Sequence, residues 1–374
     1  MKKEENTIGL FRISGLIRNN IFLFSLIFLA AILMIRMHIA PARAISFIDR
    51  RTIITLAGLL LVTYGIKESG FFDLAATRLT RNIHNERYLA LFLVFLSAFL
   101  SAFFTNDIAL FIVVPLTLGL QKVLKKNYSR IIIFEALAVN AGSALTPIGN
   151  PQNIFLWHQW DISFPRFVTA MSPVVLVLLL WLLLFTLVSF PGARISTDGR
   201  KEEPVNKRLF YLSLFLLTGF IISIEMDAGR WFLPVILLAY LILSRNVLLK
   251  ADWLLLLLFI FLFIDVGLLI RIPLLHEMLN SLQLQETGRL FLAGMVGSQV
   301  ISNVPATLVL AHYTDDLRVL AFAVNVGGNG LLIASFANII VLRFIKNKKK
   351  FLLFHLYSVP FLLVTALTVW FLFL

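Results

Sequence analysis

The chain has 374 residues, of which 59% are hydrophobic and 14% charged, whereas a soluble domain carries about 25% charged residues. This composition excludes an ordinary soluble protein and, because there are no cysteines, it also excludes disulfides and thiolate metal sites. The net charge of +13 does not indicate nucleic-acid binding, because the basic residues lie between apolar runs and not on one face of a folded domain.

Apolar runs near the ~20 residues needed to cross a bilayer predict an all-α polytopic membrane protein with about nine transmembrane helices. Residues 1–18 precede the first run without a small-residue cleavage site, so we interpret them as a cytoplasmic segment and the run as a retained helix. A cytoplasmic linker is expected at 191–208. The predicted spans are 19–36, 51–67, 130–158, 172–190, 209–226, 230–247, 252–270, 318–343 and 350–373.

Two further apolar stretches, 87–120 and 287–314, differ from the predicted spans. Each contains a small polar cluster, at Thr105-Asn106-Asp107 and at Ser302-Asn303. A polar turn at membrane depth is tolerated only where it is buried in protein or lines a cavity. We therefore predict that both stretches are re-entrant hairpins.

The distribution of Lys and Arg predicts the orientation. With a cytoplasmic N-terminus, nine crossings and two hairpins, 24 of the 33 basic residues and every lysine fall on the cytoplasmic side. This is the positive-inside bias, and it places the C-terminus outside a bacterial or archaeal inner membrane. One outer turn departs from the bias, since it is flanked by Arg36, Arg43, Arg50 and Arg51.

The segment after the second span, 68–81, reads ESGFFDLAATRLTR. As a helix it would have one apolar and one polar side, which is typical of a helix lying in the membrane interface. An ordinary connecting loop is the alternative, and the sequence leaves both open.

The sequence contains an internal repeat. Residues 138–154 align without gaps with residues 323–339 at an offset of 185, and 101–109 align with 298–306. By the predicted orientation the two copies face opposite ways, which predicts inverted-topology repeats at 19–190 and 209–374, the second with an extra span. A chance likeness between Gly-rich apolar segments is the alternative.

The repeated segments carry groups suited to ion and substrate binding. Gly and Pro interrupt 130–158 and 318–343 and free backbone carbonyls, which coordinate cations, and N–H groups, which favour anions. The hypothesis is one cation site at Thr105, Asn106 and the Gly149-Asn150 backbone, a second at Ser302, Asn303 and the 334–335 region, and substrate between them. Hydrogen bonding between helices is the plainer role for each polar residue. The candidate binding residues are Thr105, Asn106, Asp107, Asn140, Ser143, Thr146, Gly149, Asn150, Asn153, Ser302, Asn303, Asn325, Gly328, Asn329, Ser335 and Asn338.

Acidic residues at membrane depth are candidates for proton coupling. Asp265 lies well inside its predicted span and Asp107 lies beside the hairpin asparagine, so either carboxyl could carry a coupling proton or complete a cation site. A neighbouring hydroxyl as structural partner is the plain alternative for Asp265. Glu135 lies nearer a cytoplasmic end and is expected to be solvated.

Neither a metal nor an organic cofactor is expected. The six histidines show no HxxxH or HExxH spacing, and His158, His276 and His312 fall near outer span ends, where interfacial anchoring is the expected role. No GxxxxGKS loop occurs, so ATP-driven transport by this chain alone has no support.

The segments 105–107, 140–153, 302–305 and 325–330 (TND, NAGSALTPIGNPQN, SNVP and NVGGNG) resemble the ion transporter superfamily that includes arsenite permeases, sodium–proton antiporters, citrate transporters and divalent anion–sodium symporters. The resemblance implies cation-coupled transport by an elevator-like movement, commonly in a homodimer. It assigns site roles to Thr105, Asn106, Asp107, Thr146, Pro147, Gly149, Asn150, Ser302, Asn303, Gly327 and Gly328. The dicarboxylate symporters repeat Ser-Asn-Thr in both hairpins, whereas this chain has Thr-Asn-Asp and Ser-Asn-Val, which favours the arsenite-permease and antiporter branches.

The expected function is secondary active transport of a small anion or oxyanion across the lipid bilayer, coupled to H⁺ or Na⁺, with no nucleic-acid partner. A Na⁺/H⁺ antiporter that uses Asp107 or Asp265 is the first alternative, and an ion channel is the second. A membrane-embedded enzyme would need clustered titratable groups in the spans, and the sequence lacks them. No Arg or Lys lies clearly at mid-membrane, so backbone dipoles would have to hold an anion.

Overall fold

The computed structural model describes residues 21–71, 74, 78, 83–124, 128–195, 204–345 and 349–374. Within these ranges every regular element is a helix, which confirms the predicted all-α class. The predicted cytoplasmic segment 1–18, most of the amphipathic segment 68–81 and the middle of the linker 191–208 lie outside the described residues.

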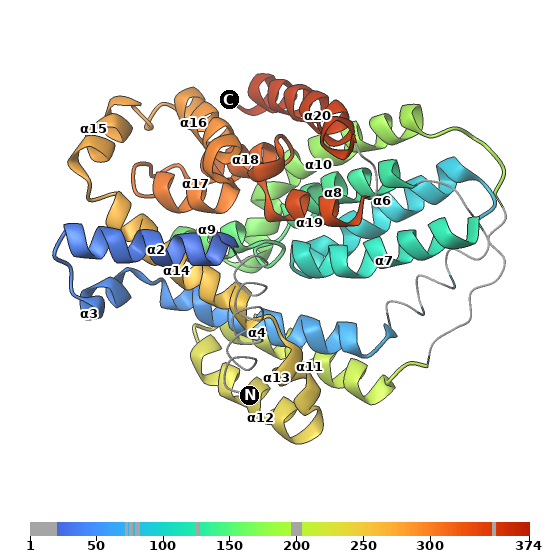
Figure 1. Ribbon diagram of the computed structural model, residues 1–374, viewed down its shortest axis with the longest axis horizontal. Coiled ribbons are helices and arrows are strands. Elements are labelled where there is room, and N and C mark those ends of the chain that lie inside the picture. The colour runs from blue at the N-terminus through green and yellow to red at the C-terminus, as the bar shows by residue number, and fades with distance from the viewer. Residues whose placement is uncertain are drawn as a thin grey trace, which may run out of the picture.

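The helices of the first half include a hairpin and an interrupted helix (Figure 1). In chain order the elements are α2 (Ile21–Arg36), α3 (Pro41–Ala44), η1 (Ile45–Phe47), α4 (Arg50–Glu68), α6 (Glu86–Phe103), α7 (Asn106–Leu124), α8 (Ser129–Ser143), α9 (Pro151–Trp160) and α10 (Phe164–Ser189).

The second half begins with α11, α12 and α13 and later repeats the succession of a hairpin, an interrupted helix and a final long helix. Its elements are α11 (Lys207–Glu225), α12 (Gly229–Leu243), α13 (Arg245–Lys250), α14 (Trp253–Leu269), α15 (Pro273–Ser281), α16 (Thr287–Ile301), α17 (Asn303–Leu310), α18 (Leu317–Gly327), η2 (Leu332–Ala334), α19 (Phe336–Phe344) and α20 (Lys350–Phe373).

Polar N-cap residues fix where several helices begin. Asp49, Asn85, Asn206, Asp252 and Asp316 each accept a hydrogen bond from a backbone N–H of the first turn of α4, α6, α11, α14 and α18. Such caps satisfy N–H groups that the helix itself leaves unpaired and contribute about 1 kcal/mol each. The short side chains between the apolar runs therefore set the boundaries of the helices.

The two predicted hairpins fold as helix pairs. The first consists of α6 and α7 joined at residues 104–105, and the second of α16 and α17 joined at Ser302, whose φ of 77° lies in the left-handed region. Figure 1 shows the pairs approaching the middle of the molecule from opposite sides, α6–α7 from the right and α16–α17 from the left. The second pair is shorter than predicted, because α17 ends at Leu310.

Each half of the chain also packs against a helix of the other half. Helix α4 of the first half packs against α11 and α12, whereas α14 of the second half packs against α2. Behind the interrupted helices, α10 packs against α8 and α18, and α20 packs against α18 and α8. Helices of the two halves are thus interleaved in the core.

Four described helices are long and apolar enough to cross a membrane alone, namely α6, α10, α11 and α20. The count rises to six if each of two bent pairs is one span, and these pairs turn by 120° after α2 and by 85° after α14. The other predicted spans correspond to shorter or interrupted helices and to α4, which carries Arg50, Arg51, Lys67 and Glu68 at its ends. Together with the exposed apolar side chains on these helices, this supports a polytopic membrane protein.

Helix α8 lies directly against hairpin helix α6 at a glycine. A Cβ on Gly142 would approach the backbone oxygen of Ala98 to 2.0 Å, and in the second half a Cβ on Gly327 would approach the Cα of Met295 to 3.1 Å. The close packing of each hairpin on its interrupted helix therefore depends on these glycines.

We expect Gly142→Ala to lower the stability of the protein by about 1–3 kcal/mol, because the backbone of α6 must move to admit the methyl group. The midpoint of thermal unfolding in detergent measures this. Gly297→Ala is the matched control, since its Cβ would meet no atom closer than 3.4 Å, and alanine favours a helix by up to about 1 kcal/mol. Equal midpoints for the two variants would contradict the packing argument.

Candidate functional site

The first interruption separates α8 from α9. Residues 144–150 form turns, and Asn150 then starts α9 by accepting a hydrogen bond from the backbone N–H of Asn153 at 2.9 Å. Pro151 occupies the first position of α9, where its missing N–H costs nothing. The predicted break at the TPIGNPQN segment is therefore present, and its asparagine caps the outgoing half-helix.

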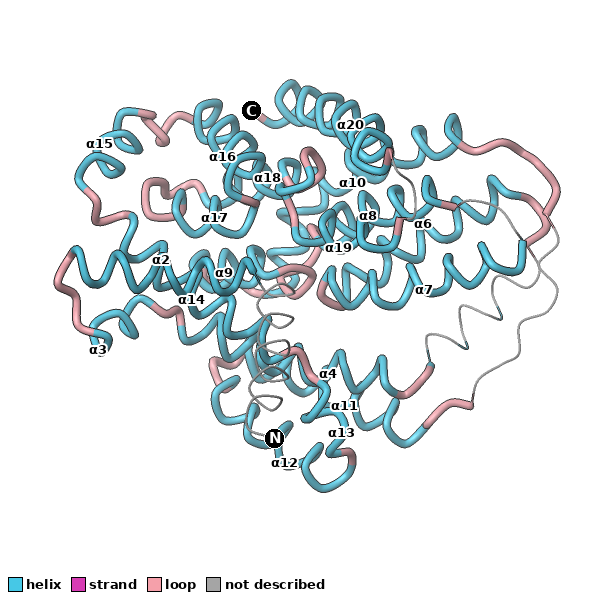
Figure 2. The backbone as a smooth tube through the Cα atoms, in the orientation of Figure 1, coloured by secondary structure: helices cyan, strands magenta, loops and turns pink. Residues whose placement is uncertain are grey.

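The second interruption separates α18 from α19 and has no proline. Helix α18 ends at Gly327, the short 3₁₀ helix η2 follows, and Ser335 starts α19 by accepting a hydrogen bond from the N–H of Ala337 at 3.3 Å. Ser335 occupies the position that Asn150 holds in the first copy, so a capping side chain starts both outgoing half-helices. Figure 2 shows loops at both interruptions, near the middle of the molecule.

The turn of each hairpin lies against the break in its own half. The N–H of Asn106 donates to the carbonyl of Gly149 at 2.9 Å. In the second half, the Ser302 hydroxyl lies 3.5 Å from the carbonyl of Ala334, and the Asn303 amide lies close to Gly328. In each half, the structure thus brings together the residues that the sequence assigned to one cation site.

Four buried asparagines connect the two halves. The Asn140 amide donates to Oδ1 of Asn338 at 2.9 Å, and the Asn325 amide donates to Oδ1 of Asn153 at 2.8 Å. Asn140 and Asn325 lie on the incoming half-helices, and their partners lie on the outgoing half-helices of the opposite half. Each interrupted helix is therefore tied to the other at its break.

The hydrogen bonds follow the same 185-residue offset as the sequence. Four bonds of the first copy have a counterpart in the second. The matched pairs are Asn140–Asn338 with Asn325–Asn153, Asn153–Ser143 O with Asn338–Gly328 O, Asn153–Thr146 O with Asn338–Leu331 O, and Asn150–Asn325 with Ser335–Asn140. The network therefore has an approximate two-fold relation, although the boundaries predicted for the repeats stay a prediction.

Several buried polar atoms at this centre have no hydrogen-bond partner within the described ranges. They include Oδ1 of Asp107, Oδ1 of Asn329 and Oε1 of Gln152. Oxygen atoms of this kind are ligands for Na⁺ or acceptors for water. They are the groups at the centre that remain available for an ion.

The remaining predicted residues have separate roles. The Thr146 hydroxyl donates to the carbonyl of Ala102 and ties the first break to its hairpin. The Ser143 hydroxyl donates to the carbonyl of Asn140, while Thr105 is buried at the turn of the hairpin. Asp265 lies apart on α14, buried, with no partner for either carboxylate oxygen in the described part of the chain.

One expectation for the acids is wrong. Glu135 is not solvated but fully buried, and it accepts a hydrogen bond from the hydroxyl of Thr117 on hairpin helix α7. Its predicted position near a cytoplasmic end indicated solvent, but α6, α7 and α10 pack against α8. Sequence position alone could not reveal this cover.

Sequence reasoning also missed two glutamines. The Gln299 side chain donates to the carbonyl of Gly327 and accepts from the N–H of Leu331, so it bridges the second break. Gln152 is buried on the first turn of α9. Gln299 lies inside the repeated segment 298–306, and this position in the repeat could have indicated a role at the break.

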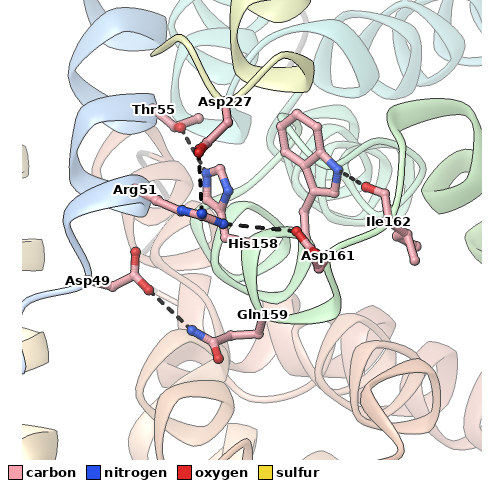
Figure 3. Close-up of polar contacts among 9 residues, drawn as sticks. Asp49, Arg51, Thr55, His158, Gln159, Asp161, Ile162 and Asp227 are labelled. Carbon is pink, nitrogen blue, oxygen red and sulfur yellow. Dashed lines mark hydrogen bonds and ion pairs between the residues drawn. The ribbon is translucent and has the colours of Figure 1, made fainter. Parts of the chain in front are cut away.

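A second polar cluster joins the C-terminal end of α9 to the start of α4 (Figure 3). Nε2 of His158 lies 2.9 Å from the hydroxyl of Thr55, and the Gln159 amide donates to Asp49 at 3.2 Å. Arg51 forms ion pairs with Asp161 at 3.9 Å and with Asp227 at 3.5 Å. His158 thus contacts α4. The cluster connects α9, the second part of an interrupted helix, to α4.

The ends of eight helices, four from the hairpins and four from the interrupted helices, surround the centre. Helices α7, α9, α17 and α19 begin there, and α6, α8, α16 and α18 end there. Helix N-termini carry partial positive charge and favour anions, whereas helix C-termini present carbonyls that favour cations. The arrangement can therefore bind an anion and a cation next to each other.

Several known proteins are similar in sequence to this chain. Residues 16–317 match a family described as citrate transporter. The chain is 45% identical over 330 residues to the inner membrane protein YbiR of Escherichia coli, with 88% of each chain covered. It is 34% identical over 326 residues to an uncharacterized transporter of Methanocaldococcus jannaschii, covering 86% and 89% of the two chains. It is also 28% identical over 189 residues to the human P protein, covering 48% of this chain and 22% of that one.

We expect Asn140→Ala and Asn338→Ala each to cost about 1–3 kcal/mol of stability, because each leaves buried acceptors or donors unpaired. Since the two side chains bond each other, the double variant should lose less than the sum, with a coupling of at least about 0.5 kcal/mol. Denaturant titration in detergent micelles measures both.

The control for this cycle pairs Asn140→Ala with Asn85→Ala, which removes the N-cap of α6 at its far end. These two changes should be additive. Additivity of Asn140→Ala with Asn338→Ala as well would show that the connection between the halves does not stabilise the protein.

Proposed function

Because the chain belongs to the citrate transporter family, we propose that it is a secondary active transporter that moves a small anion or oxyanion across the membrane, coupled to H⁺ or Na⁺. The observation that carries this proposal is the asparagine-linked centre, where two interrupted helices and two hairpin turns meet. Four helix N-termini at this centre supply positive potential for an anion, and no Arg or Lys is buried in the part of the chain that the structure describes.

The groups around the N-termini support a cation next to the anion. The carbonyls at the two breaks and the oxygens of Asp107 and Asn329 are hard oxygen ligands. A cation held there would offset the charge of the substrate and give coupling between the two. We keep the two predicted cation sites, around Asn106 and around Asn303, as the proposed ion sites.

A Na⁺/H⁺ antiporter is the second candidate function. It is favoured by Asp107 and Asp265, because Oδ1 of Asp107 and both carboxyl oxygens of Asp265 are buried without a hydrogen-bond partner among the residues described. A carboxyl group without donors is costly to ionise in a buried position, so it tends to hold a proton or a cation. Transport assays with and without an added anion separate the two functions.

An elevator-like movement fits the grouping of the helices. Helices α4, α11, α12 and α13 pack together at the bottom of Figure 1, while the hairpins and interrupted helices gather above them. We propose that the upper group carries the substrate past the lower one. The homodimer that the family resemblance implies stays a prediction.

The transported species is testable by flux into proteoliposomes. Citrate, succinate, arsenite, phosphate and Na⁺ are offered in turn, each with an imposed pH gradient or Na⁺ gradient. The proposal expects saturable, gradient-dependent uptake of at least one anion. Uptake of Na⁺ against H⁺ without any anion would replace it with the antiporter, and unsaturable flux would indicate a channel.

We expect Asn106→Ala and Asn303→Ala each to reduce uptake by at least about tenfold, which corresponds to about 1.4 kcal/mol, because each removes a polar group from a hairpin turn at the centre. The amount of folded protein, measured by size-exclusion chromatography, should stay unchanged. Asn85→Ala, outside the centre, should transport normally. Normal uptake by both hairpin variants would remove the proposed ion sites.

Neutralising the coupling carboxyl should separate exchange from accumulation. If Asp107 or Asp265 carries the coupling ion, its replacement by Asn should preserve counterflow of labelled substrate but abolish gradient-driven accumulation. Asp315→Asn, in an exposed turn, is the control. Full accumulation by both Asp107→Asn and Asp265→Asn would show that neither acid is needed for coupling.

A further inference from the structure

A cavity of about 460 Å³ lies outward of the asparagine-linked centre, between α9, α14, α17 and the loop before α4. Phe155 lies five residues beyond Asn150 on α9, and Leu308 lies five residues beyond Asn303 on α17. With a helical rise of about 1.5 Å per residue, the cavity begins about 7–8 Å from the centre along both helices. The sequence predicts that this end of the molecule faces outside.

The cavity has an apolar floor and a polar mouth. Phe155, Phe263, Val266 and Leu308 are buried and line it, and the rings of Phe155 and Phe263 are 5.8 Å apart. The exposed lining residues are polar, namely Ser46, Gln159, Arg271 and His312. The two phenylalanines belong to α9 and α14, so the ring contact at the floor joins an interrupted helix to α14.

Arg271 is the charged group at the mouth that remains available to a ligand. Its guanidinium lies 4.2 Å from the centre of the Phe47 ring, and no carboxylate partner occurs in the described part of the chain. Gly267 allows this arrangement, because a Cβ there would approach Phe47 to 2.5 Å. The ring therefore positions Arg271 from one face and leaves its N–H groups free to bind.

The acidic residue of the lining is already engaged. One oxygen of Asp49 accepts from the backbone N–H of Thr52 at 2.8 Å, and the other accepts from the amide of Gln159 at 3.2 Å (Figure 3). At the other side of the mouth, Nδ1 of His312 donates to the carbonyl of Leu308 at 2.8 Å, so this nitrogen is also engaged within the protein. The balance of available groups thus favours an anion over a cation.

We propose that this cavity is an outer vestibule that binds a small organic anion, with Arg271 holding its carboxylate before the anion reaches the centre. The volume lies in the usual range for small-molecule sites, about 300–1,000 Å³, and exceeds what an inorganic ion needs. An arginine presents paired N–H groups that match a carboxylate, and a positive mouth raises the local concentration of anions. The role of this site in transport rests on the proposed function, whereas the binding site itself does not.

The chain has no cysteine, so a single thiol can report on the vestibule. Ala311 lines the cavity one residue before His312 and is replaced in Ala311→Cys. In detergent micelles, where both ends of the protein are accessible, an anionic and a cationic methanethiosulfonate are compared by their labelling rates. The anionic reagent is itself a small organic anion and serves as the probe.

We expect the ratio of anionic to cationic labelling to fall by about fivefold or more when Arg271→Gln is added. Arg43→Gln is the matched control, because Arg43 is an exposed arginine on α3, in the same chain segment as the lining residues Ser46 and Phe47, and does not itself line the cavity. A ratio that Arg271→Gln leaves unchanged, or that Arg43→Gln lowers equally, would overturn the vestibule.

Transport kinetics connect the vestibule to function. For an anion that the flux screen identifies, Arg271→Gln should raise KM severalfold with little change in maximal rate, since capture and not the central step is affected. If labelling depends on Arg271 but no anion is transported, the proposed function fails and the site stands. If an anion is transported but labelling does not depend on Arg271, the vestibule fails alone.

Discussion

A backbone that breaks within the membrane must find hydrogen-bond partners in the protein, because lipid offers none. In this structure asparagine side chains supply them. The Asn153 amide donates to the carbonyls of Ser143, Ala144 and Thr146, and the Asn338 amide donates to those of Gly328 and Leu331. Asparagines thus cover most of the carbonyls that the breaks expose, while Gln299 covers the carbonyl of Gly327 in the second break.

The same asparagines also determine how the two halves meet. Each amide has two N–H donors and a carbonyl acceptor, so it can cover its own break and still bond the opposite half. Asn153 does this with Asn325, and Asn338 with Asn140. The first break contains prolines and the second only glycines, yet the bonds correspond. The way in which the two halves meet therefore depends on the asparagines and not on the residues that interrupt the helices.

Much of this centre could be predicted from sequence, because the 185-residue offset and the asparagine turns are local patterns. The offset even implied which residues correspond, although not that Asn140 would bond Asn338 across the halves, since that depends on packing. Glu135 was misjudged for the same reason, because its cover comes from helices distant in the chain. The unpaired arginine of the outer cavity depends on Phe47 and Gly267 meeting, which no spacing indicates.

The proposed movement would have to separate the C-terminal end of α9 from the start of α4. The two ion pairs of Arg51 are solvent-exposed, and such pairs contribute about 0–1 kcal/mol each. The bond between Thr55 and His158 is part-buried, so it contributes more than an exposed contact. Contacts of this size hold one arrangement without preventing another, whereas the asparagine bonds between the halves lie within the group that would move and can persist throughout. The asparagine network would thus keep the binding site intact during the movement. The weaker contacts between α9 and α4 would determine to which side of the membrane the site is open.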